Sequence, residues 1–103
     1  MNIIPIDNAP RYDTSVDIDG AYITFSFRWN RKTKCYFVLA TDAESNVYIP
    51  NKAIYGNGAI EFSRNSKKIQ GALYLISNQE GFTPPLENWA DNYILATSTI
   101  RLE

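Results

Sequence analysis

The chain has 103 residues, a formal net charge of −1, and a composition that is 45% hydrophobic and 14% aromatic. This length fits a single domain spanning residues 1–103, and the composition is typical of a folded protein rather than a disordered one. The sequence contains no His and one Cys, which excludes an internal disulfide, a multi-Cys zinc site and every catalytic arrangement that needs His. We therefore expect a protein that is not an enzyme and binds no cofactor or metal.

The first thirty residues predict a β-hairpin. A short strand is expected at residues 15–18, and Asp19-Gly20 after it is a strong signal for a two-residue turn. Apolar and polar residues then alternate from 21 to 29, which predicts a half-buried strand. One face of that strand is apolar and consists of Ala21, Ile23, Phe25, Phe27 and Trp29.

The middle of the chain predicts short strands separated by polar turns. Residues 35–40 are apolar throughout, so we expect a strand that is buried on both faces. A further short strand begins at residues 47–49, and Pro50 either ends it or places it at a sheet edge. Residues 59–62 fit a strand or a short helical turn.

The last part of the chain predicts two longer strands and one helical turn. Residues 70–77 form a strong strand pattern. Pro85 suits the first position of a short helix over residues 85–89. The chain then closes with a strand over residues 91–102, one face of which holds Ile94, Ala96, Ser98, Ile100 and Leu102.

These elements together predict an all-β fold with six to seven strands and at most one short helix. Two packed sheets, or one sheet curled into a barrel, would bury the apolar faces. The expected architecture is therefore a small antiparallel sandwich or a partly closed barrel. The longest apolar runs, residues 37–40 and 72–76, are too short for a membrane span, so we expect no membrane partner.

Two motifs resemble ligand sites only superficially. Aligning Gly20 with the glycine of a calcium loop places Ser26 where a bidentate Glu is required. Gly56-Asn57-Gly58 could begin a dinucleotide fingerprint, but Glu61 stands at the third glycine position and no long helix follows. Turns explain both segments better, which is why no cofactor or metal is expected.

Charge is segregated along the chain although the net charge is small. Residues 28–34 hold Arg28, Arg31, Lys32 and Lys34 without an acid, residues 64–68 hold three more basic side chains, and acids gather in the first twenty residues. Two solvated turns would explain this pattern. Alternatively, a basic edge meets an acidic edge of a neighbouring subunit. Nucleic-acid binding would need stacking aromatics beside the basic loops and does not fit the net charge, so it is not expected.

Two further functions remain open alternatives. A hydrolase could use a carboxylate pair drawn from Glu61, Glu80, Glu87 and Asp91, although the sequence does not fix their separation. A binding module for carbohydrate or a host protein could use Trp89 with the Pro84-Pro85 loop. Cys35 lies in an apolar run and is interpreted as a small buried hydrophobe.

The order of features along most of the chain resembles the small baseplate plug proteins of contractile-tailed phages, a type known from a cyanophage and from many myovirus-like prophages. The resemblance rests on spacing rather than on one diagnostic motif. The segments that carry it are Ile3-Ile4-Pro5, Asn8-Ala9-Pro10, Val16-Asp17-Ile18-Asp19-Gly20, Tyr22-Ile23-Thr24-Phe25, Arg28-Trp29-Asn30-Arg31, Tyr36-Phe37-Val38-Leu39 and Gly71-Ala72-Leu73-Tyr74-Leu75-Ile76.

This resemblance implies a structural virion part at the tail axis, where the tube meets the hub and spike. It implies an all-β fold, synthesis in the host cytoplasm, and assembly with hub, tube and spike proteins or with copies of the chain. It supplies no catalytic residue, substrate or cofactor. Exposed strand edges and a surplus of aromatics suit such contacts. The interface candidates are Tyr22, Arg28, Arg31, Tyr48, Tyr55, Phe82 and Trp89.

Overall fold

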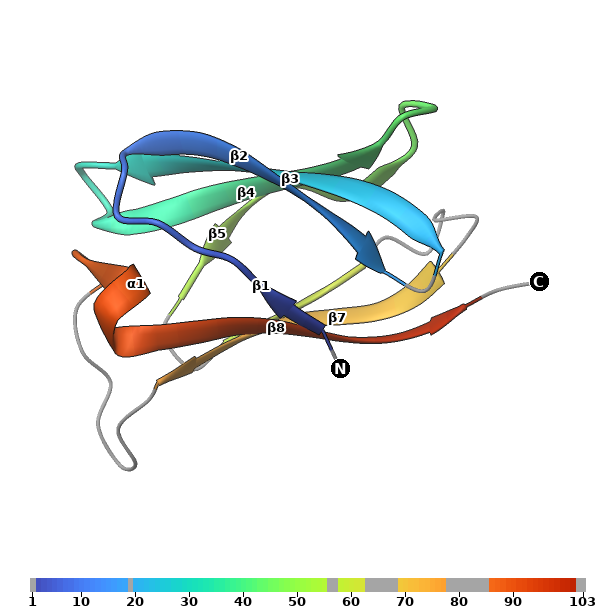
Figure 1. The fold of residues 1–103 in the computed structure, drawn as a ribbon. Coiled ribbons are helices and arrows are strands. Elements are labelled where there is room, and N and C mark those ends of the chain that lie inside the picture. Colours follow the sequence, from blue (N-terminus) through green and yellow to red (C-terminus); the bar gives the residue numbers. More distant parts are fainter. Residues whose placement is uncertain (1, 19, 56–57, 63–68, 78–85, 102–103) are drawn as a thin grey trace.

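The computed structural model describes residues 2–18, 20–55, 58–62, 69–77 and 86–101. Two antiparallel four-stranded sheets pack face to face, with one short helix at an end of the sandwich (Figure 1). The predicted all-β sandwich is thus confirmed, and the sheets do not close into a barrel. No helix in the described part of the chain is long and apolar enough to cross a membrane.

The first sheet is a meander in which strands adjacent in sequence are adjacent in space. Its order is β2 (Arg11–Ile18), β3 (Ala21–Asn30), β4 (Cys35–Asp42) and β5 (Val47–Ile54). The predicted hairpin is present, since Ile18 pairs with Ala21 across the turn. Gly20 has φ 87° and its N–H donates to the Asp17 carboxylate at 3.0 Å, so Asp17 orders a turn.

The second sheet brings the two ends of the chain together. Its order is β1 (Asn2–Ile4), β8 (Tyr93–Arg101), β7 (Ile69–Ser77) and β6 (Ala59–Glu61). The described residues form eight strands rather than six or seven, because β1 adds a three-residue edge beside β8. Nothing in the local pattern of such a short segment signals a strand; the exposed edge of β8 supplies its hydrogen-bond partners.

Two predicted strands differ in detail from the structure. The strand at 35–40 is not buried on both faces, since Phe37 and Leu39 are only half-buried on the outer side of the sheet. The strand that begins at Val47 lies at the edge of the sheet, as one of the two predicted roles of Pro50 requires, but it continues through Pro50 to Ile54. Pro50 lies in a bulge opposite Leu39 and has no paired residue on β4. Its missing N–H is therefore tolerated at this point of the sheet.

Gly71 determines how closely β7 and β8 approach. Its φ is 152°, and a Cβ atom at this position would lie 2.1 Å from the Ser98 carbonyl oxygen. A side chain is therefore excluded at this point of the β7–β8 pairing.

The space between the sheets is filled by branched aliphatic and aromatic side chains. Phe25, Phe27, Ile23 and Leu95 are among the fully buried ones. Thr97, on β8, is the one polar residue among the buried side chains of the described chain, and its hydroxyl has no hydrogen-bond partner.

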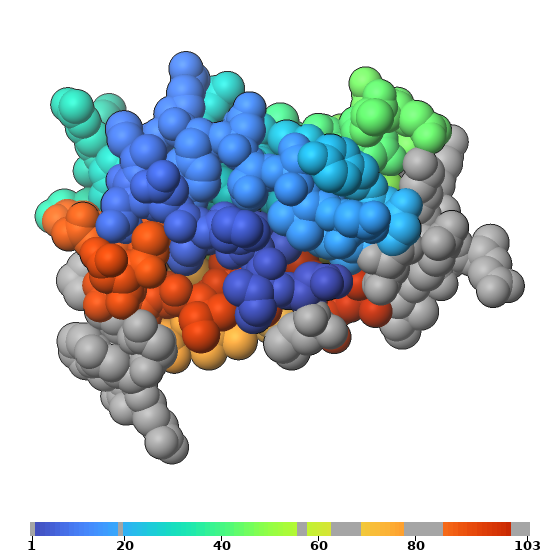
Figure 2. Space-filling view, in the orientation of Figure 1, coloured from blue at the N-terminus to red at the C-terminus, as the bar shows by residue number. Residues whose placement is uncertain are grey.

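The helix α1 (Trp89–Asn92) lies at one end of the sandwich and begins where the predicted helix of residues 85–89 was expected to end. Asn88 has φ 57°, which is not helical, so the helix cannot extend backward through it. The Asn8 side chain accepts a hydrogen bond from the Ala90 N–H at 2.9 Å and thereby satisfies a free donor of the first turn. In Figure 2 the orange α1 residues lie directly against the blue N-terminal segment.

Candidate functional site

The outer face of the β2–β5 sheet carries transverse rows of side chains that the strand register defines. Paired residues of antiparallel strands point to the same side. Arg11 pairs with Arg28, and Arg28 pairs with Phe37, so two guanidinium groups stand side by side next to an aromatic ring. In the next row, Asp13 pairs with Ser26, and Ser26 pairs with Leu39.

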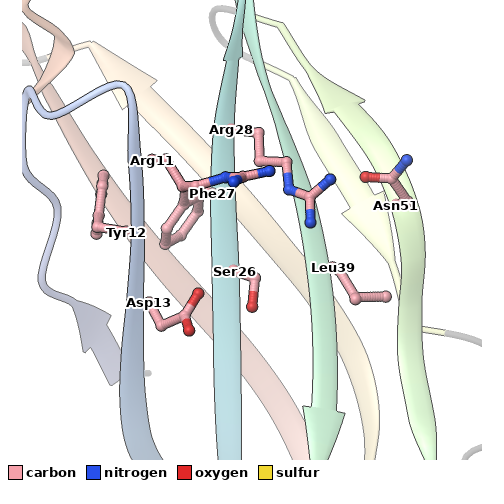
Figure 3. A pocket seen from close by; sticks show the side chains of 8 residues that line it. All are labelled: Arg11, Tyr12, Asp13, Ser26, Phe27, Arg28, Leu39 and Asn51. Atoms are coloured by element: carbon pink, nitrogen blue, oxygen red, sulfur yellow. The ribbon is translucent and has the colours of Figure 1, made fainter.

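These two rows line an open hollow of about 590 Å³. Each arginine side chain lies over the neighbouring strand, Arg11 over β3 and Arg28 over β4, and both extend toward β5 (Figure 3). The bulge in β5 adds Asn51, which has φ 53°. The lining residues are Arg11, Tyr12, Asp13, Ser26, Phe27, Arg28, Leu39 and Asn51.

Positive charge continues from the hollow to the turn between β3 and β4. Arg31, Lys32 and Lys34 are exposed on this turn. The Asn30 side chain orders it by accepting hydrogen bonds from the N–H groups of residues 32 and 33, at 2.9 and 3.1 Å. The second predicted basic loop, residues 64–68, lies outside the described residues.

The opposite end of the same sheet is acidic and internally bonded. Asp42, at the end of β4, accepts hydrogen bonds from the N–H groups of Glu44 and Asn46, from the Asn46 side chain and from the Tyr48 hydroxyl. Burial raises the pKa of Asp42, but these hydrogen bonds outweigh it and lower the pKa from 3.8 to about 2. This carboxylate is therefore committed to holding the β4–β5 turn.

Part of the outer face of the second sheet is aliphatic, beside a polar part that holds Glu61, Gln70 and Ser98. Ile76 pairs with Ile94, and Ile3 pairs with Ala96, which in turn pairs with Tyr74. Ile3 is 61% exposed, Ile76 is 43% exposed and Ile94 is 42% exposed. Ile3, Ile76, Ile94 and Ala96 form what we call the aliphatic face, and Tyr74 borders it. Their rows contain no charged side chain, whereas the outer face of the first sheet carries several.

The predicted aromatic contacts divide into exposed and buried residues. Tyr22 and Tyr55 are 62% and 65% exposed, and Arg28 and Arg31 are also exposed. Tyr48 and Trp89 are fully buried inside the sandwich, so neither is available as a contact residue on the folded chain. Phe82 lies outside the described residues.

Trp89 instead holds α1 to the N-terminal segment and to the first sheet. Its indole N–H donates to the Asp7 carbonyl at 2.6 Å, and its ring stacks on Tyr36 with centroids 4.3 Å apart. The ring that the carbohydrate alternative relied on is thus covered. Nearby, burial is the main cause that raises the pKa of Tyr12 to about 12, although the Asp7 N–H donates to its hydroxyl.

The chemically reactive side chains of the described residues are dispersed. Glu61 is exposed on β6, Glu87 in the turn before α1 and Asp91 on α1, and Glu80 lies outside the described residues. Cys35 is buried, with its sulfur 3.1 Å from the Thr33 hydroxyl. Within the described ranges, no group of three potential metal ligands of the His, Cys, Asp and Glu types comes together.

Sequence reasoning missed Arg11 and the three exposed isoleucines. Arg11 stands outside the basic run at residues 28–34, and only the register of β2 against β3 brings it beside Arg28. The isoleucines look like core residues by composition. Their alternation with Leu95 and Leu75, which are buried, could have indicated a second apolar face.

The sequence matches a known protein family over most of its length. A family model described as the cyanophage baseplate Pam3 plug gp18 matches residues 1–98. The chain belongs to this family of baseplate plug proteins. Comparisons with curated proteins and with solved structures gave no match.

Membership gives the chain a structural role in a phage baseplate. It implies a location in the tail baseplate of the virion and contacts with other phage baseplate proteins. A structural family also favours a role without catalysis. The resemblance that the sequence showed is thereby confirmed.

Proposed function

We propose that this baseplate protein is a plug subunit at the junction of tail tube and spike. It contacts hub, tube and spike proteins and copies of itself, is made in the host cytoplasm, and performs no catalysis. The family match over residues 1–98 carries this proposal. The two outer faces support it, because three exposed isoleucines on one side and a cluster of basic side chains on the other offer surfaces that other polypeptides would cover.

The aliphatic face is the surface that we assign to self-association. Two identical faces can approach only where their charges do not repel, and the rows through Ile3, Ile76 and Ile94 carry no charge. The outer face of the other sheet carries Arg11 and Arg28, which would repel the same residues of a second copy. Sheets packed through aliphatic faces lie about 10 Å apart, as in other sandwiches.

Purified tail particles provide the test of placement. Cryo-electron microscopy of intact tails should show density for this sandwich on the tail axis, between the last tube ring and the spike. Particles assembled without the chain should lack that density while keeping tube and hub. Density found only in the sheath, the wedges or the fibres, or no copy of the chain in purified tails, would overturn the proposal.

A further inference from the structure

Arg11 and Arg28 form a like-charge pair that the folded chain leaves uncompensated. They lie directly opposite one another on β2 and β3 and are exposed. Among the described residues, no ion pair or side-chain hydrogen bond to either guanidinium is present. Like charges at directly opposed positions of an antiparallel pair destabilise the sheet. A counter-charge from outside the chain would reverse that effect.

The surroundings of the pair have the shape and chemistry of a shallow binding site. The hollow of about 590 Å³ beside it has an apolar wall at Leu39 and polar groups at Ser26 and Asn51 (Figure 3). Half-buried Phe37 stands in the same row as Arg28. A binding partner can therefore bury an apolar side chain and pair a carboxylate in the same place.

The net charge of the residues around the hollow determines which sign of charge a partner must carry. Asp13 is the one acidic residue among the eight that line the hollow, against two arginines. The local excess of positive charge attracts a negatively charged partner.

We propose that the hollow around Arg11 and Arg28 binds an acidic segment of a partner protein. One or two carboxylates of that segment pair with the guanidinium groups, in the bidentate geometry that Arg favours, and a neighbouring apolar side chain packs against Leu39. This inference deepens the proposed function, since it names the chemistry of a partner that a baseplate subunit would contact.

Two other occupants fit the surface less well. Nucleic acid would require exposed aromatic rings for base stacking, and the aromatic residues of the lining, Tyr12 and Phe27, are half-buried and fully buried. A second copy would have to offer acidic groups of its own. Asp42 and Asp17 already accept hydrogen bonds from their own turns, and the exposed Glu61 and Glu87 stand singly on separate segments.

The test measures the affinity of the purified chain for a short fluorescein-labelled peptide of alternating Glu and Leu. Fluorescence anisotropy of the peptide reports the binding. Replacing both arginines, in the variant Arg11→Gln with Arg28→Gln, is expected to weaken binding roughly tenfold or more, because hydrogen bonds to charged groups contribute strongly. Leu39→Ser should weaken it more modestly and leave its salt dependence unchanged. Thermal unfolding verifies that each variant is folded.

The control removes the same number of charges outside the hollow. The variant Arg31→Gln with Lys32→Gln should change peptide affinity by no more than roughly twofold, since its charges act only at long range through salt-screened solvent. Equal weakening by both double variants, no binding of the peptide by the unmodified chain, or tighter binding of a single-stranded oligonucleotide of equal charge would overturn the inference. None of these results bears on the placement of the chain in tails, which microscopy decides separately.

Discussion

Trp89 connects parts of the chain that are distant in sequence. It bonds to Asp7, stacks on Tyr36 of β4 and makes an edge contact with Phe27 of β3, with ring centroids 5.3 Å apart. An aromatic residue in a small β domain can serve either as core or as contact surface. Here the buried indole N–H finds a backbone acceptor, which is the usual condition for burying tryptophan.

Replacing Trp89 is therefore expected to damage the fold rather than a binding surface. Trp89→Ala should lower the free energy of unfolding by about 3–5 kcal/mol, as for large-to-small substitutions in cores. Tyr22→Ala, at an exposed aromatic residue, should change it by no more than about 0.5 kcal/mol. Urea denaturation of both variants measures the difference; comparable losses would contradict the assignment of Trp89 to the core.

Thr97 is a buried hydroxyl without a partner in the described structure. Removing an unsatisfied buried donor regains its desolvation cost, so Thr97→Val should raise the free energy of unfolding by about 1 kcal/mol. Thr24→Val is the matched control, because the Thr24 hydroxyl lies 2.9 Å from that of Ser15 on the outer face. It should give no gain. A loss of stability in Thr97→Val would show that the hydroxyl has a partner.

The ends of individual strands and of the helix are fixed by different kinds of contact. Some depend on residues nearby in the sequence and others on residues far away in it. The β2–β3 hairpin is local: Gly20 and the Asp17 side chain define the turn within four residues. The helix α1 is the opposite case, since the donor of its first turn is satisfied by Asn8, far away in sequence. The β4–β5 turn is again local and depends on Asp42.

The β4–β5 turn predicts a pH dependence of stability. The pKa of Asp42 is lowered from 3.8 to about 2 because, against the effect of burial, its charged form accepts hydrogen bonds from Asn46, Tyr48 and Glu44. A carboxyl group with a lowered pKa stabilises the fold above its unfolded pKa. This contribution is complete above about pH 3.8 and is lost as the pH falls toward 2.

Urea denaturation across this pH range measures the contribution. The variant Asp42→Asn should be less stable than the unmodified chain at neutral pH, and its stability should fall less steeply between pH 3.8 and 2. The two stability curves are expected to converge at the acidic end of the range. Parallel curves for the two proteins would mean that the turn does not depend on the charge.

On the scale of the whole molecule, the two sheets present faces of different chemistry to solvent. The outer side of β2–β5 is polar and basic near the β3–β4 turn, and the outer side of the other sheet includes an aliphatic area. A monomer in water would gain nothing from exposing three isoleucines on one face. In the proposed assembly, these isoleucines are expected to lie against a neighbouring chain.

The aliphatic face is expected to mediate concentration-dependent association. Light scattering after size exclusion should give a mass above that of one chain for the unmodified protein. Ile76→Thr with Ile94→Thr should return it to one chain, since Thr keeps the β-branched shape but removes the apolar surface. Val47→Thr, at a 41% exposed residue of the other sheet, is the control and should not alter association.

Much of the fold could be predicted from the sequence, because the decisive signals are local. Apolar and polar residues alternate along residues 21–29, because successive side chains of a strand point to opposite faces and one of these faces is exposed to solvent. Asp19-Gly20 predicts a tight turn, because both residue types suit the backbone angles that such a turn requires. The same local order carried the resemblance to baseplate plug proteins.

The candidate site depended on tertiary structure, because it is made of pairings between strands. Arg11 and Arg28 are seventeen positions apart, and only the β2–β3 register, Arg11 against Arg28, places them side by side. The burial of Trp89 and Tyr48 and the exposure of Ile76 and Ile94 were likewise decided by which face of each sheet met the other. The alternation of side chains along a strand indicates that the strand has two faces. The packing of the two sheets determines which face is exposed to solvent.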